Sequence, residues 1–253
     1  MRALWAVLAV AAATVAHSRL SGQSPPVALA RPGNGIVSGP VHPSRHKFVG
    51  SSACGGENQS LVVEEIALRG DSEILFVQSL QFSDQPNALV DSAVLDRRNL
   101  APVSERRHLG QDTSASWQFR GLRVLGFTQQ PGERRRSYDS KLREPAFPDV
   151  IISLLLRATP LLYAPEGKIT FATFGFEEEE GKPPSLMLYT DTARVTGSKT
   201  VRLPNGTRLE AWVVGVGNAP DVVAYWVEKS THELVGWSVP SQDCATNYLS
   251  VSP

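Results

Sequence analysis

Short runs of apolar or alternating residues recur from Leu61 onward, and turn-forming residues separate them. Runs of this length and spacing are typical of strands in a sandwich, a barrel or a strongly curved sheet. The short connections cannot cross over, so neighbouring strands are expected to be antiparallel. We predict an all-β fold, a highly curved antiparallel sheet or near-closed β-barrel of about 10–12 strands. The runs are 61–68, 74–82, 88–95, 103–109, 116–119, 122–128, 169–176, 186–190, 199–203, 207–216, 222–227 and 234–239.

Two positions between these runs carry turn signals. Asn205-Gly206 lies between two β-favouring runs and supplies the positive φ angles that a tight hairpin turn requires. Gly197-Ser198 predicts a second turn. Both indicate hairpins in the later half of the chain.

One segment departs from the strand pattern. Residues 149–158 begin with Asp149, are rich in leucine and end before Pro160, which predicts a short helix. The apolar face would be formed by Ile151, Leu154, Leu155 and Ala158, and it could close one side of a curved sheet. A buried strand is the alternative, because Val-Ile-Ile favours β structure.

The first residues have the layout of a secretory signal peptide. Arg2 precedes an apolar run that ends near Ala16, and small or polar residues follow. We predict a signal peptide over 1–18, a Pro/Gly-rich leader over 19–56 and a single β domain over 57–253. No cysteine near residue 18 could accept a lipid, and no later run predicts a transmembrane segment. The chain is therefore expected to be exported, to the periplasm or beyond the cell.

Charge and cysteine content add two expectations. The 25 basic residues balance the 25 acidic ones, so the net charge does not point to nucleic acid as a partner. The two cysteines, Cys54 and Cys244, are predicted to form a disulfide, because an exported protein occupies an oxidising compartment. Two buried thiols are the alternative.

The chain shows no complete catalytic or metal-binding motif. Asp91-Ser92-Ala93 and Asp191-Thr192-Ala193 resemble the paired aspartates of aspartic proteases, but they lack the glycine expected in the third position. Gly236-Trp237-Ser238 lacks the closing glycine of a nucleophile elbow. We therefore predict no catalytic residues, no metal site, no cofactor and no enzymatic activity.

The aromatic content of the predicted strands permits a ligand-binding interior. Packing of a core explains these residues without any ligand and is the favoured of the two interpretations, both of which stay open. The residues expected to line a ligand site are Trp117, Phe119, Leu154, Leu155, Phe174, Trp212, Tyr225 and Trp226.

Four segments carry a family resemblance: Val94 to Val103, Val195-Thr196-Gly197, Val201 to Val214, and Tyr225 to Val235. Together they resemble the DUF3108-like family of exported bacterial proteins, and more distantly the lipoprotein carriers of the periplasm. The resemblance implies a highly curved antiparallel sheet in the cell envelope. The carriers would further imply a hydrophobic cavity. No catalytic residue is implied.

These observations lead to one functional hypothesis and two alternatives. The first is a non-enzymatic envelope protein that binds an apolar or lipid-like ligand within its curved sheet. The second is an interaction or scaffold module with a filled core that meets another envelope protein. The third is a hydrolase with an unfamiliar site.

Overall fold

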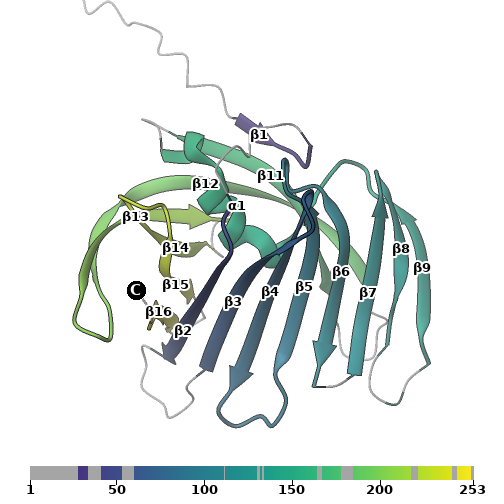
Figure 1. The fold of residues 1–253 in the computed structure, drawn as a ribbon, viewed down its shortest axis with the longest axis horizontal. Helices are drawn as coiled ribbons and strands as arrows, with labels where there is room; N and C mark the ends of the chain where they lie inside the picture. Colours follow the sequence, from purple (N-terminus) through teal and green to yellow (C-terminus); the bar gives the residue numbers. More distant parts are fainter. Residues whose placement is uncertain are drawn as a thin grey trace, which may run out of the picture.

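The computed structural model describes residues 28–33, 41–52, 60–110, 112–129, 132, 134–163, 167–177, 185–217, 222–240 and 244–251. Within these residues all strands join one large sheet around a single short α-helix (Figure 1). The strands are β1 (Ala28–Ala30), β2 (Ser44–Ser52), β3 (Ser60–Arg69), β4 (Glu73–Phe82), β5 (Leu89–Asp96), β6 (Pro102–Leu109), β7 (Asp112–Arg120), β8 (Arg123–Thr128), β9 (Arg136–Lys141), β10 (Phe147–Pro148), β11 (Lys168–Glu177), β12 (Ser185–Arg202), β13 (Arg208–Val216), β14 (Val223–Glu228), β15 (Leu234–Pro240) and β16 (Ala245–Ser250).

The strand order explains the shape of the sheet. It runs β1-β11-β12-β13-β14-β15-β16-β2-β3-β4-β5-β6-β7-β8-β9, and β10 adds to β11. All pairings are antiparallel except those of the short β1 and β10 with β11. The predicted all-β class is confirmed: the sheet is strongly curved and antiparallel for the most part, and it is not closed.

The described part of the sheet has 16 strands, more than the 10–12 expected. Strands β1 and β10 are too short to show a pattern, while β9 and β16 are rich in polar residues. Strand β2 lies inside the range predicted as a leader, yet it pairs with β16 and β3 in the middle of the sheet. Its nine residues contain no proline, although prolines flank the segment, and this local sequence permits a full strand.

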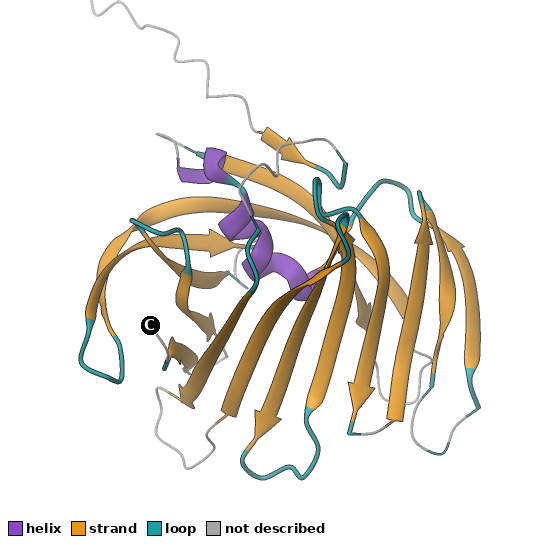
Figure 2. Ribbon diagram, viewed as in Figure 1, coloured by secondary structure: helices purple, strands orange, loops and turns teal. Residues whose placement is uncertain are grey.

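The predicted helix is confirmed. A 3₁₀ turn, η1 (Asp149–Ile151), leads into α1 (Ile152–Ala158), and a second 3₁₀ turn, η2 (Pro160–Tyr163), follows Thr159. Figure 2 shows these turns and the helix on the concave side of the curved sheet. The predicted apolar face is at most 2% exposed, and Ser153 and Leu156 are buried as well. The helix therefore contacts the interior of the sheet on several sides, rather than lying across it with one face in solvent.

The core extends from α1 to both halves of the sheet. Leu154 and Leu155 belong to one cluster with Phe48, Phe76 and Phe171. A second cluster joins β7 and β8 to β11, with Trp117 and Phe174 at its centre. The two ends of the curved sheet are thus held together by side-chain packing and not by a closed ladder of hydrogen bonds.

The two predicted turns have different outcomes. The Asn205-Gly206 hairpin is confirmed: the Leu203 amide donates to the Thr207 carbonyl, and Gly206 has φ +87°. The turn predicted at Gly197-Ser198 is wrong, because both residues lie inside β12. The pairing with β13 shifts between Val195 and Gly197, so this glycine accompanies a bulge instead of ending the strand.

No helix in the part of the chain that the structure describes is long and apolar enough to cross a membrane. Residues 1–27 are outside the described residues, and the predicted signal peptide is among them.

Candidate functional site

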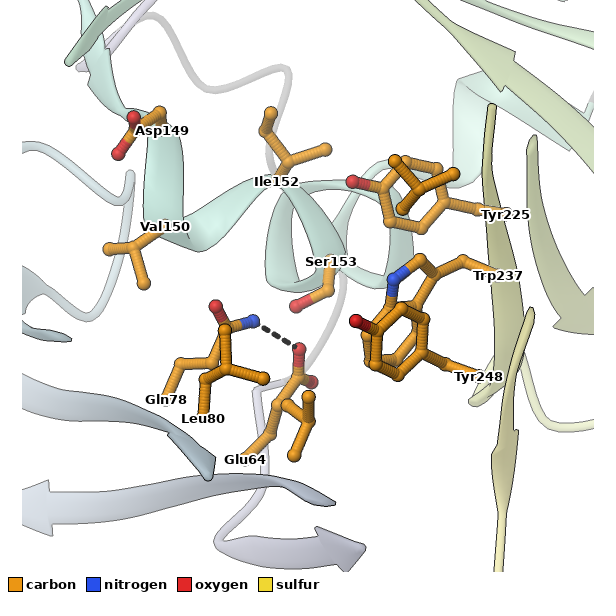
Figure 3. A pocket seen from close by; sticks show the side chains of 12 residues that line it. Glu64, Gln78, Leu80, Asp149, Val150, Ile152, Ser153, Tyr225, Trp237 and Tyr248 are labelled. Carbon is orange, nitrogen blue, oxygen red and sulfur yellow. Dashed lines mark hydrogen bonds between the residues drawn. The ribbon is translucent and has the colours of Figure 1, made fainter. Parts of the chain in front are cut away.

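A cavity of about 190 Å³ lies between the concave face of the sheet and the start of α1 (Figure 3). Its walls come from β3, β4, β14, β15 and β16, and its roof comes from η1 and α1. The lining residues are Val62, Glu64, Gln78, Leu80, Asp149, Val150, Ile152, Ser153, Tyr225, Trp237, Val239 and Tyr248.

A row of polar residues crosses five neighbouring strands beneath this cavity. The pairing register places His46 opposite Glu64, Glu64 opposite Gln78, Gln78 opposite Asp91, and Asp91 opposite Arg107. We call these five residues the polar row. Residues opposite one another in register lie on the same face of a sheet. This face is the buried concave one, where polar groups are costly unless they serve as partners or bind something.

Hydrogen bonds and ion pairs join neighbours within the polar row. The Gln78 amide donates to Glu64 Oε1 at 3.1 Å. Arg107 donates to both carboxylate oxygens of Asp91, at 2.7 and 3.2 Å. Glu64 is only 1% exposed, and its Oε2 accepts no hydrogen bond from any described residue.

Arg157 of α1 supplies the charge opposite Glu64. Its Nη2 lies 3.7 Å from Glu64 Oε2, and its Nη1 donates to Glu233 Oε2 at 2.9 Å. His46 Nε2 is 3.5 Å from the same Glu233 oxygen. Burial and the nearby Arg157 guanidinium lower the pKa of His46, so the imidazole is neutral at pH 7 and Arg157 is the cation that faces both carboxylates.

A row of aromatic residues forms the opposite wall. Tyr225 pairs with Trp237, and Trp237 pairs with Tyr248, on three successive strands. The Trp237 and Tyr248 rings are stacked, with centroids 4.6 Å apart and planes at 13°, and the Tyr225 ring stacks 6.5 Å from Trp237. We call these three residues the aromatic row. The polar edges of these rings are turned toward the cavity. Figure 3 shows the hydroxyls of Tyr225 and Tyr248 and the indole nitrogen of Trp237 on the cavity side.

Gly50 makes room for the end of the aromatic row. It is the partner of Tyr248 across the β16–β2 pairing. A Cβ at this position would approach the Tyr248 ring to 2.6 Å and would also collide with the Ser60 hydroxyl. A glycine is therefore required where Tyr248 packs down on β2.

Asp149 and Ser153 close the cavity from above. Burial raises the pKa of Asp149 to about 6, against the opposing effect of Arg107. Ser153 is 4% exposed, and its hydroxyl has no hydrogen-bond partner among the residues described. Gly175 of β11 lies against the Asp149 carboxylate, where a Cβ would come within 2.4 Å. The Asp149 carboxyl group is thus buried and closely packed against Gly175.

Glu105 adds a second buried acid behind Asp149. It is 3% exposed, and burial, followed by the charges of Asp149 and Asp91, raises its pKa well above the ordinary value. The nearby Arg107 acts in the opposite direction. Burial thus favours the protonated form of Glu105 over a wider pH range than for an exposed glutamate.

These side chains do not form a metal centre. Within the described ranges, no group of three or more His, Cys, Asp or Glu residues is placed to hold a metal ion. The cavity lining offers hydroxyl, amide, indole and carboxyl groups for hydrogen bonding beside apolar surface.

The residues predicted to line a ligand site are distributed over four places. Tyr225 lines the cavity described above. Leu154 and Leu155 lie in the core beside it, and Trp212 packs against that core. Trp117, Phe119 and Phe174 belong to the second cluster, and Phe119 also lines a separate apolar hollow of about 230 Å³. Trp226 lies in a third cluster with Val235, beneath the Lys199 ammonium.

Most of the polar lining was not predicted from the sequence. Glu64, Gln78 and Ser153 carry no motif. Trp237 is one of the aromatic residues of the predicted strands but is not among the predicted lining residues, and Tyr248 lies outside the predicted strands. The aspartates of the two protease-like tripeptides both point inward but are separate: Asp91 pairs with Arg107, and Asp191 accepts a hydrogen bond from Thr173 at 2.8 Å. Of the predicted cysteine pair, Cys54 lies outside the described residues.

Comparison with known families decides the relationship suggested by the sequence. The family model described as "Protein of unknown function (DUF3108)" matches residues 62–240. The chain belongs to the DUF3108 family. The DUF3108 match includes most of the cavity lining, from Val62 to Val239, but leaves out β2 and β16 with His46 and Tyr248. No curated protein matches the chain.

Proposed function

We propose that this DUF3108 protein is an exported, non-enzymatic binding protein that holds an amphipathic, lipid-like ligand between its curved sheet and α1. The observation that carries the proposal is the cavity at which the polar row and the aromatic row meet. Polar side chains buried without full hydrogen bonding lower stability, and binding sites are where such groups are commonly kept.

The size of the cavity indicates how much of a ligand it could enclose. An apolar cavity of roughly 150 Å³ accommodates one benzene molecule, so about 190 Å³ suits one ring or a group of similar size. Leu80 and the 38% exposed Val239 lie at the more open side of the lining. A ligand would therefore place its polar end inside and extend an apolar part past these two residues.

Export is part of the proposal. It is supported by the signal-peptide layout of residues 1–18, and a periplasmic or extracellular location is expected from it. A lipid-like ligand is abundant in that environment.

Native mass spectrometry of the protein purified from its own cells tests the proposal. We expect a stoichiometric adduct that organic extraction releases and identifies. Leu80→Trp should abolish the adduct, because the indole would occupy the cavity. Leu75→Trp is the matched control: it makes the same change on the same strand but on the opposite face of the sheet, and it should keep the adduct.

The contrary result is equally clear. A wild-type protein that carries nothing, both as purified and after incubation with a lipid extract of its own envelope, would overturn the proposal. The filled-core interaction module would then be favoured.

A hydrolase is the second candidate, and one observation favours it. Asp149 has its pKa raised to about 6, which suits a general acid or base near neutral pH, and it lines the same cavity as Glu64. The test is to follow the released ligand by mass spectrometry over time in the presence of the protein. Conversion that Asp149→Asn stops would support hydrolysis, whereas an unchanged ligand would support binding alone.

A further inference from the structure

The unused hydrogen-bonding groups around the cavity are of mixed kind. Glu64 Oε2 and the Ser153 hydroxyl have no hydrogen-bond partner among the described residues. Figure 3 shows the Tyr225 hydroxyl, the Trp237 indole N–H and the Tyr248 hydroxyl turned toward the same cavity. The indole N–H can only donate, the Glu64 carboxylate can only accept, and the hydroxyls can do either. A ligand that satisfies this set must donate and accept within the space of one small group.

Charged head groups fail this requirement. A carboxylate or phosphate only accepts, and it would face Glu64 and Asp149 with no cation in the lining; Arg157 is already engaged by Glu64 and Glu233. An ammonium could pair with Glu64, but it only donates, so it would leave the Trp237 N–H without an acceptor.

Neutral hydroxyl groups meet the requirement to donate and accept hydrogen bonds within a small space. Each hydroxyl donates one hydrogen bond and accepts others, so adjacent hydroxyls can donate to Glu64 and accept from Trp237 and the tyrosines. The aliphatic side of such a group would contact Val62, Val150 and Ile152. The cavity volume of about 190 Å³ suits one sugar ring or a glycerol unit.

We propose that the cavity selects a neutral, polyhydroxylated head group, a sugar ring or glycerol unit, on a ligand whose apolar part leaves past Leu80 and Val239. This proposal rests on the binding function proposed above and names the class of ligand for the same site.

Three probes that share one tail and differ in the head group test it. Octyl glucoside, octylamine and octanoate are titrated into delipidated protein by calorimetry, each below its micelle concentration. We expect octyl glucoside to bind at least tenfold more tightly than either charged probe.

Two substitutions connect the preference to the cavity. Tyr248→Phe removes one hydroxyl from the aromatic row and is expected to weaken octyl glucoside binding about five- to tenfold, the effect of one lost hydrogen bond. Tyr189→Phe is the matched control, because that side chain is 40% exposed on β12 and outside the lining. It should leave the affinity unchanged, and thermal melting of both variants checks that they fold.

The outcomes separate this proposal from the one before it. Equal or tighter binding of octylamine or octanoate, or an unchanged affinity in Tyr248→Phe, would overturn the head-group assignment while a binding function stands. If none of the probes binds although the purified protein carries a native adduct, the head-group assignment is likewise overturned and a binding function stands. No probe binding to a protein that is also empty when purified would overturn both proposals.

Discussion

Arg157 forms ion pairs with two carboxylates, that of Glu64 on β3 and that of Glu233 directly before β15. Its side chain is 7% exposed, and it contacts Glu64, which is 1% exposed, as well as Glu233. Removing the cation from a buried pair leaves an uncompensated charge, which is far more costly than losing a surface pair.

Arg157→Met is therefore expected to lower the free energy of unfolding by about 3–5 kcal/mol, measured by urea denaturation. Arg123→Met is the matched control, since Arg123 pairs with Asp139 on the surface and both are more than half exposed. Its cost should be small beside that of Arg157→Met, because solvent screens an exposed pair. Similar losses in the two variants would contradict the view that Glu64 depends on Arg157.

Asp149 makes stability depend on pH. Its pKa rises from the ordinary value of 3.8 to about 6 on folding, so the native state binds the proton more tightly than the unfolded state. The contribution of Asp149 to the free energy of unfolding should accordingly fall as the pH rises from about 4 to about 6, by about 3 kcal/mol at most. Asp149→Asn should make the fall in this range shallower, as urea denaturation at a series of pH values would show, whereas Glu105, whose pKa burial also raises, keeps contributing a fall of the same sign.

Asp139 provides a control of opposite sign. Arg123 holds the pKa of this surface carboxyl below its ordinary value, so its contribution is present at neutral pH and is lost on acidification. Asp139→Asn should therefore leave the fall between pH 4 and 6 in place. If it flattened the curve as Asp149→Asn does, Asp149 would not be the group responsible.

Single residues were also the hardest level to predict from the sequence. Glu64 lies between Val63 and Glu65, so nothing local shows that it faces inward while Glu65 faces out. The polar row becomes visible only when the register of five strands is known, and register depends on contacts between distant segments. The places of Trp237 and Tyr248 beside the cavity could not be predicted for the same reason.

At the scale of elements, prediction was more successful. The helix near 149–158 was specified by its leucines and by Pro160, and β12–β13 by Asn205-Gly206. Strand β2 was missed because the prolines around it dominated the local composition. Gly197 was misjudged because a glycine within a strand can mark a bulge as well as a turn.

The β2–β16 pair depends on Gly50. Gly50→Ala should lower the free energy of unfolding by about 1–3 kcal/mol, because the new methyl group would displace Tyr248 and Ser60. Gly197→Ala is the control on β12, where no atom lies within 4 Å of the added carbon. It should be close to neutral in the same denaturation assay, and a costly Gly197→Ala beside a harmless Gly50→Ala would contradict the packing described for Tyr248.

At the scale of the whole molecule, the predicted Cys54–Cys244 disulfide can be argued from the described pairing. Strands β2 and β16 pair as far as Ser52 and Thr246, and each of these residues is two positions from a cysteine. We expect the oxidised protein to resist maleimide labelling under denaturing conditions until it is reduced. Cys244→Ser should then cost about 5 kcal/mol of stability on the chain-entropy model, less any native strain. Labelling of two thiols without reduction would contradict the disulfide.

The same pair has a consequence for the order of assembly. Ser52 and Cys244, which approach to 3.9 Å between Oγ and Sγ, are 192 residues apart in the chain. Strands β2 to β9 can pair with one another as they are synthesised, and so can β11 to β15. Among the described strands, the two halves share a ladder only through β16. Until β16 has left the ribosome, β2 is an edge strand, and the edge that later pairs with β16 is open to pairing with other chains.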